Sequence, residues 1–454
     1  MAGKKKTAYV CSQCGHSEPK WLGRCPSCGE WNTFSEIKIS GSGSAEKPYA
    51  SGGSEPVVLS GIQAQPPEYS PTGNTELDRV LGGGITPGAA ILLGGEPGIG
   101  KSTLMLQVAA SMPGRGLYVS GEETPSQIKN RADRLDLPQD SLKVLSENNL
   151  DVLLEILNKK KPDFVVIDSI QTLISSEAGL IPGTPNQLKT AGYKLTSWSK
   201  ASGSPVILIA HVTKEGTIAG PKVIEHLVDT VLYFDHGSSE LRILRAAKNR
   251  MGSIDEIGLF RMDKSGLSAI KNPAGYFLEH RGEGPPPGSA VTAVYEGSRI
   301  LLVEIQALTV PAKASGGRVY SEGIDTSRVS RIAAVLEKHA SLKLSDNDIY
   351  INVAGGLKVS DPGADLAIAI AIFSSKSLKA LPQGMIFCGE VTLAGEIRSV
   401  QHLRRRIKTA VDTGWNKWII SAKNKDTDTL PGSGENAGNI REAIAGIISG
   451  VENS

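Results

Sequence analysis

Four short runs of apolar residues dominate the middle of the chain; the first is followed by glycines and the other three by polar residues. They cover residues 89–93, 116–120, 164–169 and 205–210. Short apolar runs bounded by glycine or polar residues are typical of strands that are buried on both faces of a sheet, and the longer segments between them suit helices. This alternation predicts an α/β fold with a parallel sheet, in which the carboxyl ends of the strands meet at one edge.

The last third of the chain has a different pattern. Strand-like alternation and helical periodicity both occur there, at 299–305, 349–353, 328–339 and 364–373. Three consecutive prolines at 285–287 make a stiff break before this region. We therefore expect a separate α+β domain at 290–454.

The loop after the first apolar run has the sequence of a Walker A motif, which connects the predicted strand to a predicted helix. In such a loop, backbone N–H groups converge on phosphate oxygens, and the helix N-terminus adds positive potential. Lys101 is expected to reach the outer phosphates, and the hydroxyl of Ser102 is expected to bind Mg²⁺. The predicted ATP-binding residues are Gly95, Glu96, Pro97, Gly98, Ile99, Gly100, Lys101, Ser102 and Thr103.

Polar residues at the ends of the other three runs complete this hypothesis. Asp168 ends the third run in a Walker B pattern and is expected to hold Mg²⁺, although an aspartate there can also cap a helix. Glu122 or Glu123, after the second run, can polarise the attacking water, and we favour Glu122; the alternative is an exposed acidic pair. His211, after the fourth run, can sense the γ-phosphate, or it can simply bond to a backbone carbonyl.

Two basic segments follow. Lys214 and Lys222 lie in a polar, glycine-containing loop that can touch DNA, although solvated loop lysines are the commoner explanation. Lys248 and Arg250 lie two residues apart at the end of a predicted strand, so their side chains point to the same side. They can complete the ATP site of a neighbouring subunit as an arginine finger does, or they can be a basic hairpin end.

The N-terminal region contains two C-x-x-C pairs, each followed by glycine. In a chain without an export signal, four such thiolates favour a closed tetrahedral Zn²⁺ site over disulfides, and two pairs together favour zinc over redox chemistry. A closed site has no open coordination position, so we expect a structural role for it. The predicted ligands are Cys11, Cys14, Cys25 and Cys28.

Length and charge add limits. With 454 residues, several domains are expected: a zinc-binding module at 1–36, a flexible Ser/Gly-rich linker at 37–59 and an ATPase domain at 60–285. The net charge of +2 means that nucleic acid can be bound only through local patches. No signal-peptide core and no apolar run of about 20 residues occurs, so we expect a cytoplasmic protein with no membrane partner.

The Walker A loop, the Asp168 strand, the two cysteine pairs and the stretch 248–252 occur together, and the chain resembles the bacterial RadA (Sms) family of RecA-like DNA-repair ATPases. Met251 stands where that family's Lys-Asn-Arg-Phe-Gly signature has phenylalanine, which keeps an apolar side chain. The resemblance implies a RecA-like core that forms a homohexameric ring. It also implies binding of single-stranded and branched DNA, with ATP-driven branch migration in DNA repair and homologous recombination, as part of the response to DNA damage. The protein partners it suggests are RecA recombinase or a replicative helicase.

The C-terminal region resembles the proteolytic domain of Lon proteases at 355–367, 388–397 and 403–406. The resemblance places Gly363 or Ala364 at the nucleophilic serine and Arg404 at the lysine base. Alanine has no nucleophile, and arginine, with a pKa above about 12, cannot act as a base near neutral pH, so we expect no peptidase activity. The domain is then a structural platform, and a basic cluster on a predicted helix either faces DNA or is a solvated face: Arg404, Arg405 and Arg406.

A second function class stays open. A RecA-like core can also bind ATP as a switch that controls protein partners, as in KaiC-like regulators, with DNA playing no part. The zinc module and the basic clusters weigh modestly against this alternative.

Overall fold

The computed structural model describes residues 6–11, 17–26, 29–39, 58, 60, 68–179, 181–211, 219–237, 240–276, 278, 285–312, 316–424 and 429–452. Contacts divide the chain into two compact units. The first unit comprises residues 1–235, 244–254 and 262–268, and the second comprises 236–243, 255–261 and 269–454. Among the described residues, no helix is both long enough and apolar enough to cross a membrane.

The N-terminal module is a small antiparallel sheet of β1 (Lys6–Cys11), β2 (Ser17–Glu18) and β3 (Phe34–Ile39), in the order β2-β1-β3. Cys11 lies opposite Phe34 in the β1–β3 register, and both are buried together with Cys25. The strand β3 continues to Ile39, past the expected end of the module at 36, because its whole length pairs with β1.

A nine-stranded sheet follows, in the order β12-β11-β10-β9-β4-β8-β7-β5-β6. All four predicted strands lie in it, and they pair in parallel: β4 with β8, β8 with β7, and β7 with β5. The prediction of a parallel α/β sheet is therefore confirmed. The strands are β4 (Ala90–Gly95), β5 (Gly116–Ser120), β6 (Lys143–Ser146), β7 (Phe164–Asp168), β8 (Val206–His211), β9 (Thr230–His236), β10 (Leu241–Asn249), β11 (Ile257–Asp263) and β12 (Gly266–Ala269).

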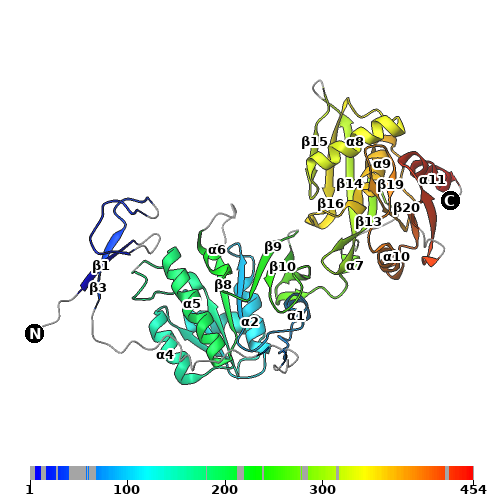
Figure 1. Ribbon diagram of the computed structural model, residues 1–454. Helices are drawn as coiled ribbons and strands as arrows, with labels where there is room; N and C mark the ends of the chain where they lie inside the picture. The colour runs from blue at the N-terminus through cyan, green and yellow to red at the C-terminus, as the bar shows by residue number, and fades with distance from the viewer. Residues whose placement is uncertain are drawn as a thin grey trace, which may run out of the picture. The chain divides into compact units, whose positions relative to one another are not determined.

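Helices cover this sheet (Figure 1). Apolar residues of α4 (Leu150–Lys160), α5 (Pro185–Ser202) and α6 (Ala219–Glu225), with the turn after α6, bury alternate strand residues in one core. Because strand side chains alternate between faces, the remaining strand residues face α2 (Lys101–Ser111), which packs on β4, β5 and β7. Side chains cap α1 (Thr75–Leu81) through Asn74 and α3 (Pro125–Arg134) through Thr124.

The C-terminal unit contains a mixed seven-stranded sheet, in the order β15-β16-β14-β13-β17-β20-β21. The strands expected around 299–305 and 349–353 are β14 and β16, so those predictions are confirmed. The strands of the sheet are β13 (Ser289–Glu296), β14 (Arg299–Pro311), β15 (Val319–Glu322), β16 (Asn347–Val353), β17 (Met385–Cys388), β20 (Lys417–Ser421) and β21 (Ser433–Ala437), and β18 (Glu390–Val391) pairs with β19 (Ile397–Arg398). The helices are α7 (Pro273–Tyr276), α8 (Thr326–Ala340), α9 (Asp365–Ser377), α10 (Leu403–Asp412) and α11 (Ile440–Glu452).

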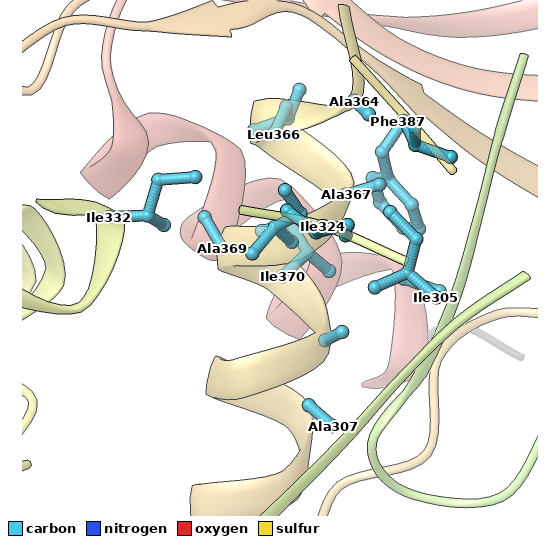
Figure 2. Packing of buried hydrophobic residues seen from close by; sticks show 14 of the residues in the cluster. Ile305, Ala307, Ile324, Ile332, Ala364, Leu366, Ala367, Ala369, Ile370 and Phe387 are labelled. Atoms are coloured by element: carbon cyan, nitrogen blue, oxygen red, sulfur yellow. The ribbon is translucent and has the colours of Figure 1, made fainter. Parts of the chain in front are cut away.

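Helix α9 lies at the centre of this unit. Every residue from Asp365 to Ser375 is buried, which is the pattern of a helix surrounded by protein on all sides. Figure 2 shows Ile370 and Ala367 of α9 close to Ile305 of β14 and Phe387 of β17. Each large aliphatic side chain buried in this way contributes about 1.5–3 kcal/mol, so this helix contributes substantially to the stability of the C-terminal fold.

The expected boundary near residue 285 does not coincide with the division of contacts. Parts of β10 and β11 group with the C-terminal unit because four of their residues belong to its buried core: Leu241, Ile243, Ile257 and Leu259.

Candidate ATP-binding site

The phosphate-binding loop connects β4 to α2, as predicted. Gly100 precedes α2 with a φ of +115°, and a Cβ at this position would lie 2.6 Å from Cε of Met262, so only glycine fits without strain. Lys101 begins the helix, is 3% exposed, and donates hydrogen bonds from Nζ to the carbonyl oxygens of Gly95 at 2.8 Å and Glu96 at 2.9 Å. The lysine side chain thus folds back onto the first two residues of the loop.

The surroundings of Lys101 strongly perturb the pKa of its ammonium group. Burial lowers the pKa of its ammonium group to about 8, although the negative charges of Asp168 and Glu122 oppose the shift. The two carboxylates therefore lie close enough to act on the charge of the lysine, as a site for Mg²⁺ and phosphate requires.

Asp168 lies at the end of β7 with 7% of its surface exposed. Its Oδ2 accepts a hydrogen bond of 2.6 Å from the hydroxyl of Tyr118 on the neighbouring strand β5. Burial, and then the charge of Asp168, raise the pKa of Tyr118 well above its usual range, so the phenol stays protonated and donates. Sequence reasoning missed Tyr118; the signal was a polar aromatic residue in the middle of a buried run, where its hydroxyl needs a partner.

The two glutamates after β5 have different surroundings. Glu123 forms an ion pair with Arg131 of α3. Glu122 instead accepts a hydrogen bond of 2.9 Å from Oγ of Ser169, and its Oε1 lies 3.8 Å from Nε2 of His211. Glu122 thus forms a cluster with Ser169, just after β7, and His211, at the end of β8, whereas Glu123 is bound to helix α3.

His211 ends β8, as predicted. Burial and the positive charge of Lys101 lower the pKa of its imidazole, so the ring is neutral at neutral pH. Its Nδ1 is buried and has no hydrogen-bond partner among the described residues. A neutral ring with an unsatisfied nitrogen can bond to a ligand or water that enters the site.

The sheet therefore brings together four predicted groups, from the ends of β4, β5, β7 and β8: Lys101, Glu122, Asp168 and His211. The carboxylate of Asp168 and the hydroxyl of the half-buried Ser102 are oxygen donors of the kind that Mg²⁺ prefers, so these residues fit the expected metal. When it is bound, Mg²⁺ supplies positive charge that stabilises phosphate oxygens.

Lys248 and Arg250 have contacts elsewhere. Nζ of Lys248 donates to the carbonyl oxygens of Glu225 at 2.9 Å and Val228 at 2.7 Å, at the C-terminal end of α6. Nη1 of Arg250 lies 3.3 Å from Oδ1 of Asp229, while the Arg250 side chain is 55% exposed. Within the chain, Lys248 thus stabilises the end of α6, and Arg250 has enough exposed surface to contact another molecule.

The expected DNA-binding cations differ in exposure. Lys222 on α6 and the α10 residues Arg404 and Arg405 are exposed, whereas Lys214 lies outside the described residues. The expectation that Arg406 binds DNA is wrong, because only 2% of its surface is exposed and its guanidinium pairs with Asp361. Such a side chain cannot contact DNA.

The helical period of the sequence could have predicted that Arg406 is buried. Arg406 comes three residues after the half-buried Leu403 and four before the buried Ala410, so it belongs to the inner face of α10. A Cβ at Gly363 would lie 3.0 Å from Nη1 of Arg406, so Arg406, and not Arg404, faces the position expected for a nucleophile. The arginine also donates to the carbonyl oxygen of Ala293 at 2.6 Å, and it lines a cavity of about 440 Å³ with Asp361 and Gly363.

The expected zinc ligands are described only in part. Cys11 and Cys25 are 0% and 1% exposed and belong to the same small core, although they come from separate segments. Cys14 and Cys28 lie outside the described residues. Two buried thiols in one small module are compatible with the expected Zn²⁺ site.

Comparisons with known families and proteins agree with this layout. Residues 9–36 match the rubredoxin metal binding domain, 62–217 match the AAA domain, and 321–424 match the subunit ChlI of Mg-chelatase. DNA repair protein RadA of Treponema pallidum is 48% identical and aligns over 99% of both chains, and that of Bacillus subtilis is 43% identical over 98% of this chain and 100% of its own. The solved structure of flagellar accessory protein FlaH from Methanocaldococcus jannaschii matches 43% of this chain and 96% of its own, at 19% identity and a TM-score of 0.36.

The parallel sheet, the phosphate loop and the carboxylate after β7 define a P-loop nucleotide-binding protein with a RecA-like core, flanked by an N-terminal zinc ribbon and a C-terminal Lon-like domain. At this identity and coverage, the chain belongs to the RadA family of DNA repair proteins.

The first prediction concerns zinc. The full chain purified without chelator is expected to contain about one zinc ion per chain, and Cys25→Ser is expected to lose most of it because a tetrahedral site needs every thiolate. Metal analysis by mass spectrometry measures this. Cys388→Ser, which changes a buried cysteine of the C-terminal unit, is the control and should keep its zinc. Equal zinc content in all three proteins would contradict the assignment.

The second prediction concerns pH. Because the pKa of Lys101 is about 8, raising the pH above that value removes the positive charge that attracts phosphate. The dissociation constant of fluorescent ADP should therefore rise by up to about tenfold per pH unit above about pH 8. Lys101→Arg is the control, since arginine stays charged and its affinity should stay flat with pH. A wild-type affinity that is constant between about pH 7 and about pH 9.5 would show that Lys101 has an ordinary pKa.

Proposed function

We propose that this chain is a DNA-dependent ATPase that acts in DNA repair and homologous recombination. It binds single-stranded and branched DNA and drives branch migration by ATP hydrolysis. The observation that carries the proposal is the convergence of Lys101, Asp168, Glu122 and His211 at one edge of the sheet, in a chain whose relatives are DNA repair proteins.

The chemistry assigned to each group follows from its position. The phosphate loop and Lys101 bind the phosphates of ATP, and Ser102 and Asp168 hold Mg²⁺. Glu122 orients and polarises the attacking water, a role for which it is better placed than Glu123, whose carboxylate pairs with Arg131. His211, neutral and with an unsatisfied nitrogen, senses the γ-phosphate.

DNA contacts are assigned to two pairs of basic residues. Lys214 and Lys222 lie after β8, whose last residue His211 is part of the ATP site, so a change at the γ-phosphate can reach them along the chain. Arg404 and Arg405 on α10 supply a second basic surface, without Arg406. A homohexameric ring, a cytoplasmic location, and RecA recombinase or a replicative helicase as partners belong to the same proposal.

The third prediction tests the motor directly. ATP turnover by the wild-type chain should rise on addition of single-stranded or forked DNA. Lys101→Ala should lower turnover by at least about 100-fold, because the positive charge that stabilises the phosphates is lost. Phosphate release measures both. Lys129→Ala removes an exposed lysine that pairs with its helix neighbour Asp133, and should leave turnover unchanged.

Two results would overturn this proposal. One is Lys101→Ala turnover equal to that of the wild type. The other is ATP turnover unaffected by any DNA together with no DNA binding at low salt, which would favour a nucleotide-switched regulator of the KaiC kind.

The fourth prediction concerns Arg250. If its exposed guanidinium reaches the ATP site of a neighbouring subunit, Arg250→Ala should lose most turnover and should recover part of it when mixed with Lys101→Ala, because some interfaces then contain one intact site and one intact arginine. Turnover of the mixture against that of each variant alone is the measurement. Arg115→Ala breaks a surface pair with Asp163 and is the matched control. Failure of the mixture to exceed both variants would confine Arg250 to its own chain, as a partner of Asp229.

A further inference from the structure

Tyr118 is the one fully buried tyrosine among the described residues that bonds directly to an expected Mg²⁺ ligand. It lies in the middle of β5, opposite Val166 of β7 and two residues before Ser120, which is opposite Asp168. Tyr118 and Asp168 therefore point to the same face of the sheet, the face covered by α2 and the phosphate loop. With 0% of its surface exposed, the ring cannot leave this position without disturbing the core.

The hydrogen bond distinguishes the two carboxylate oxygens of Asp168. Oδ2 accepts from the phenol at 2.6 Å, a short bond of the kind that a charged acceptor forms. An aspartate at the end of a strand otherwise turns freely about its terminal bond. A donor that is fixed in the core removes this freedom and leaves Oδ1 as the oxygen available to a ligand.

We propose that Tyr118 is a positioning residue for Mg²⁺: its hydroxyl holds Oδ2 of Asp168 so that Oδ1 faces the metal, directly or through a bound water. The proposal rests on the ATP site proposed above and adds to it a residue that neither binds nucleotide nor takes part in proton transfer. Because the hydroxyl of Tyr118 donates to Asp168, the effect of removing that hydroxyl should be confined to steps that depend on the metal.

The experiment uses the full chain with Tyr118→Phe, which keeps the ring and removes the hydroxyl. Fluorescent ADP titrations without metal measure the nucleotide pocket, and Mn²⁺ titrations in the presence of ADP, followed by electron paramagnetic resonance, measure the metal site. The affinity for ADP without metal should stay within about twofold of the wild type. The affinity for Mn²⁺ should fall about tenfold, which corresponds to about 1.4 kcal/mol.

Steady-state kinetics give an independent readout. In Tyr118→Phe, the Mg²⁺ concentration for half-maximal ATP turnover should rise by a similar factor, and saturating Mg²⁺ should restore most of the maximal rate. Tyr233→Phe is the matched control. It removes the hydroxyl of a β9 tyrosine that donates a hydrogen bond of 2.5 Å to the carboxylate of Glu225, on the opposite face of the same sheet. Without DNA, this variant should behave as the wild type in each assay.

The outcomes are separable. Unchanged affinity for Mn²⁺ in Tyr118→Phe, or an equal loss in Tyr233→Phe, would overturn the role of Tyr118. Loss of ADP binding without metal would make the hydroxyl a purely structural group, which also overturns it. If the wild-type chain hydrolyses no ATP, the function proposed above fails, and the Mn²⁺ titration still decides the role of Tyr118.

Discussion

The buried ammonium group of Lys101 is the charge on which the arrangement of the nucleotide site depends. An isolated cation is costly to bury, and the loop carbonyls of Gly95 and Glu96 only partly replace the water that it loses. The remaining cost appears as the lowered pKa. The negative charges of Asp168 and Glu122 offset part of this cost, and a phosphate, which carries a full negative charge, would offset more of it than either carbonyl does.

Much of the ATP domain could be predicted from sequence because its strands are buried on both faces. Continuous apolar runs such as 117–119 and 164–167 arise from that burial, and the residues that follow them must meet at one edge of a parallel sheet. This reasoning correctly placed Asp168 and His211. It could not separate Glu122 from Glu123, because the difference is a side-chain pairing with Arg131 on a helix whose packing the sequence does not show.

The C-terminal domain shows the opposite case. Three consecutive arginines form a basic surface only if all three face outward, yet on a helix successive residues are about 100° apart, so three in a row point in widely different directions. Arg406 faces inward, and its burial is tolerated because Asp361 and the carbonyl oxygen of Ala293 satisfy it. The composition of a segment indicates how much charge it carries, and only the helical period indicates which charged residues face solvent.

The contacts of the same arginine determine which substitutions this part of the domain can tolerate. Its guanidinium bonds to Asp361 and to the carbonyl oxygens of Ala293 and Gln401, whereas a lysine presents three donors from a single atom and cannot reproduce that spread. A mutation of Arg406 to lysine would leave buried acceptors unsatisfied. A serine at 363 would place its Cβ 3.0 Å from Nη1 of Arg406. A serine at 363 or a lysine at 406, introduced alone, should therefore destabilise this part of the domain.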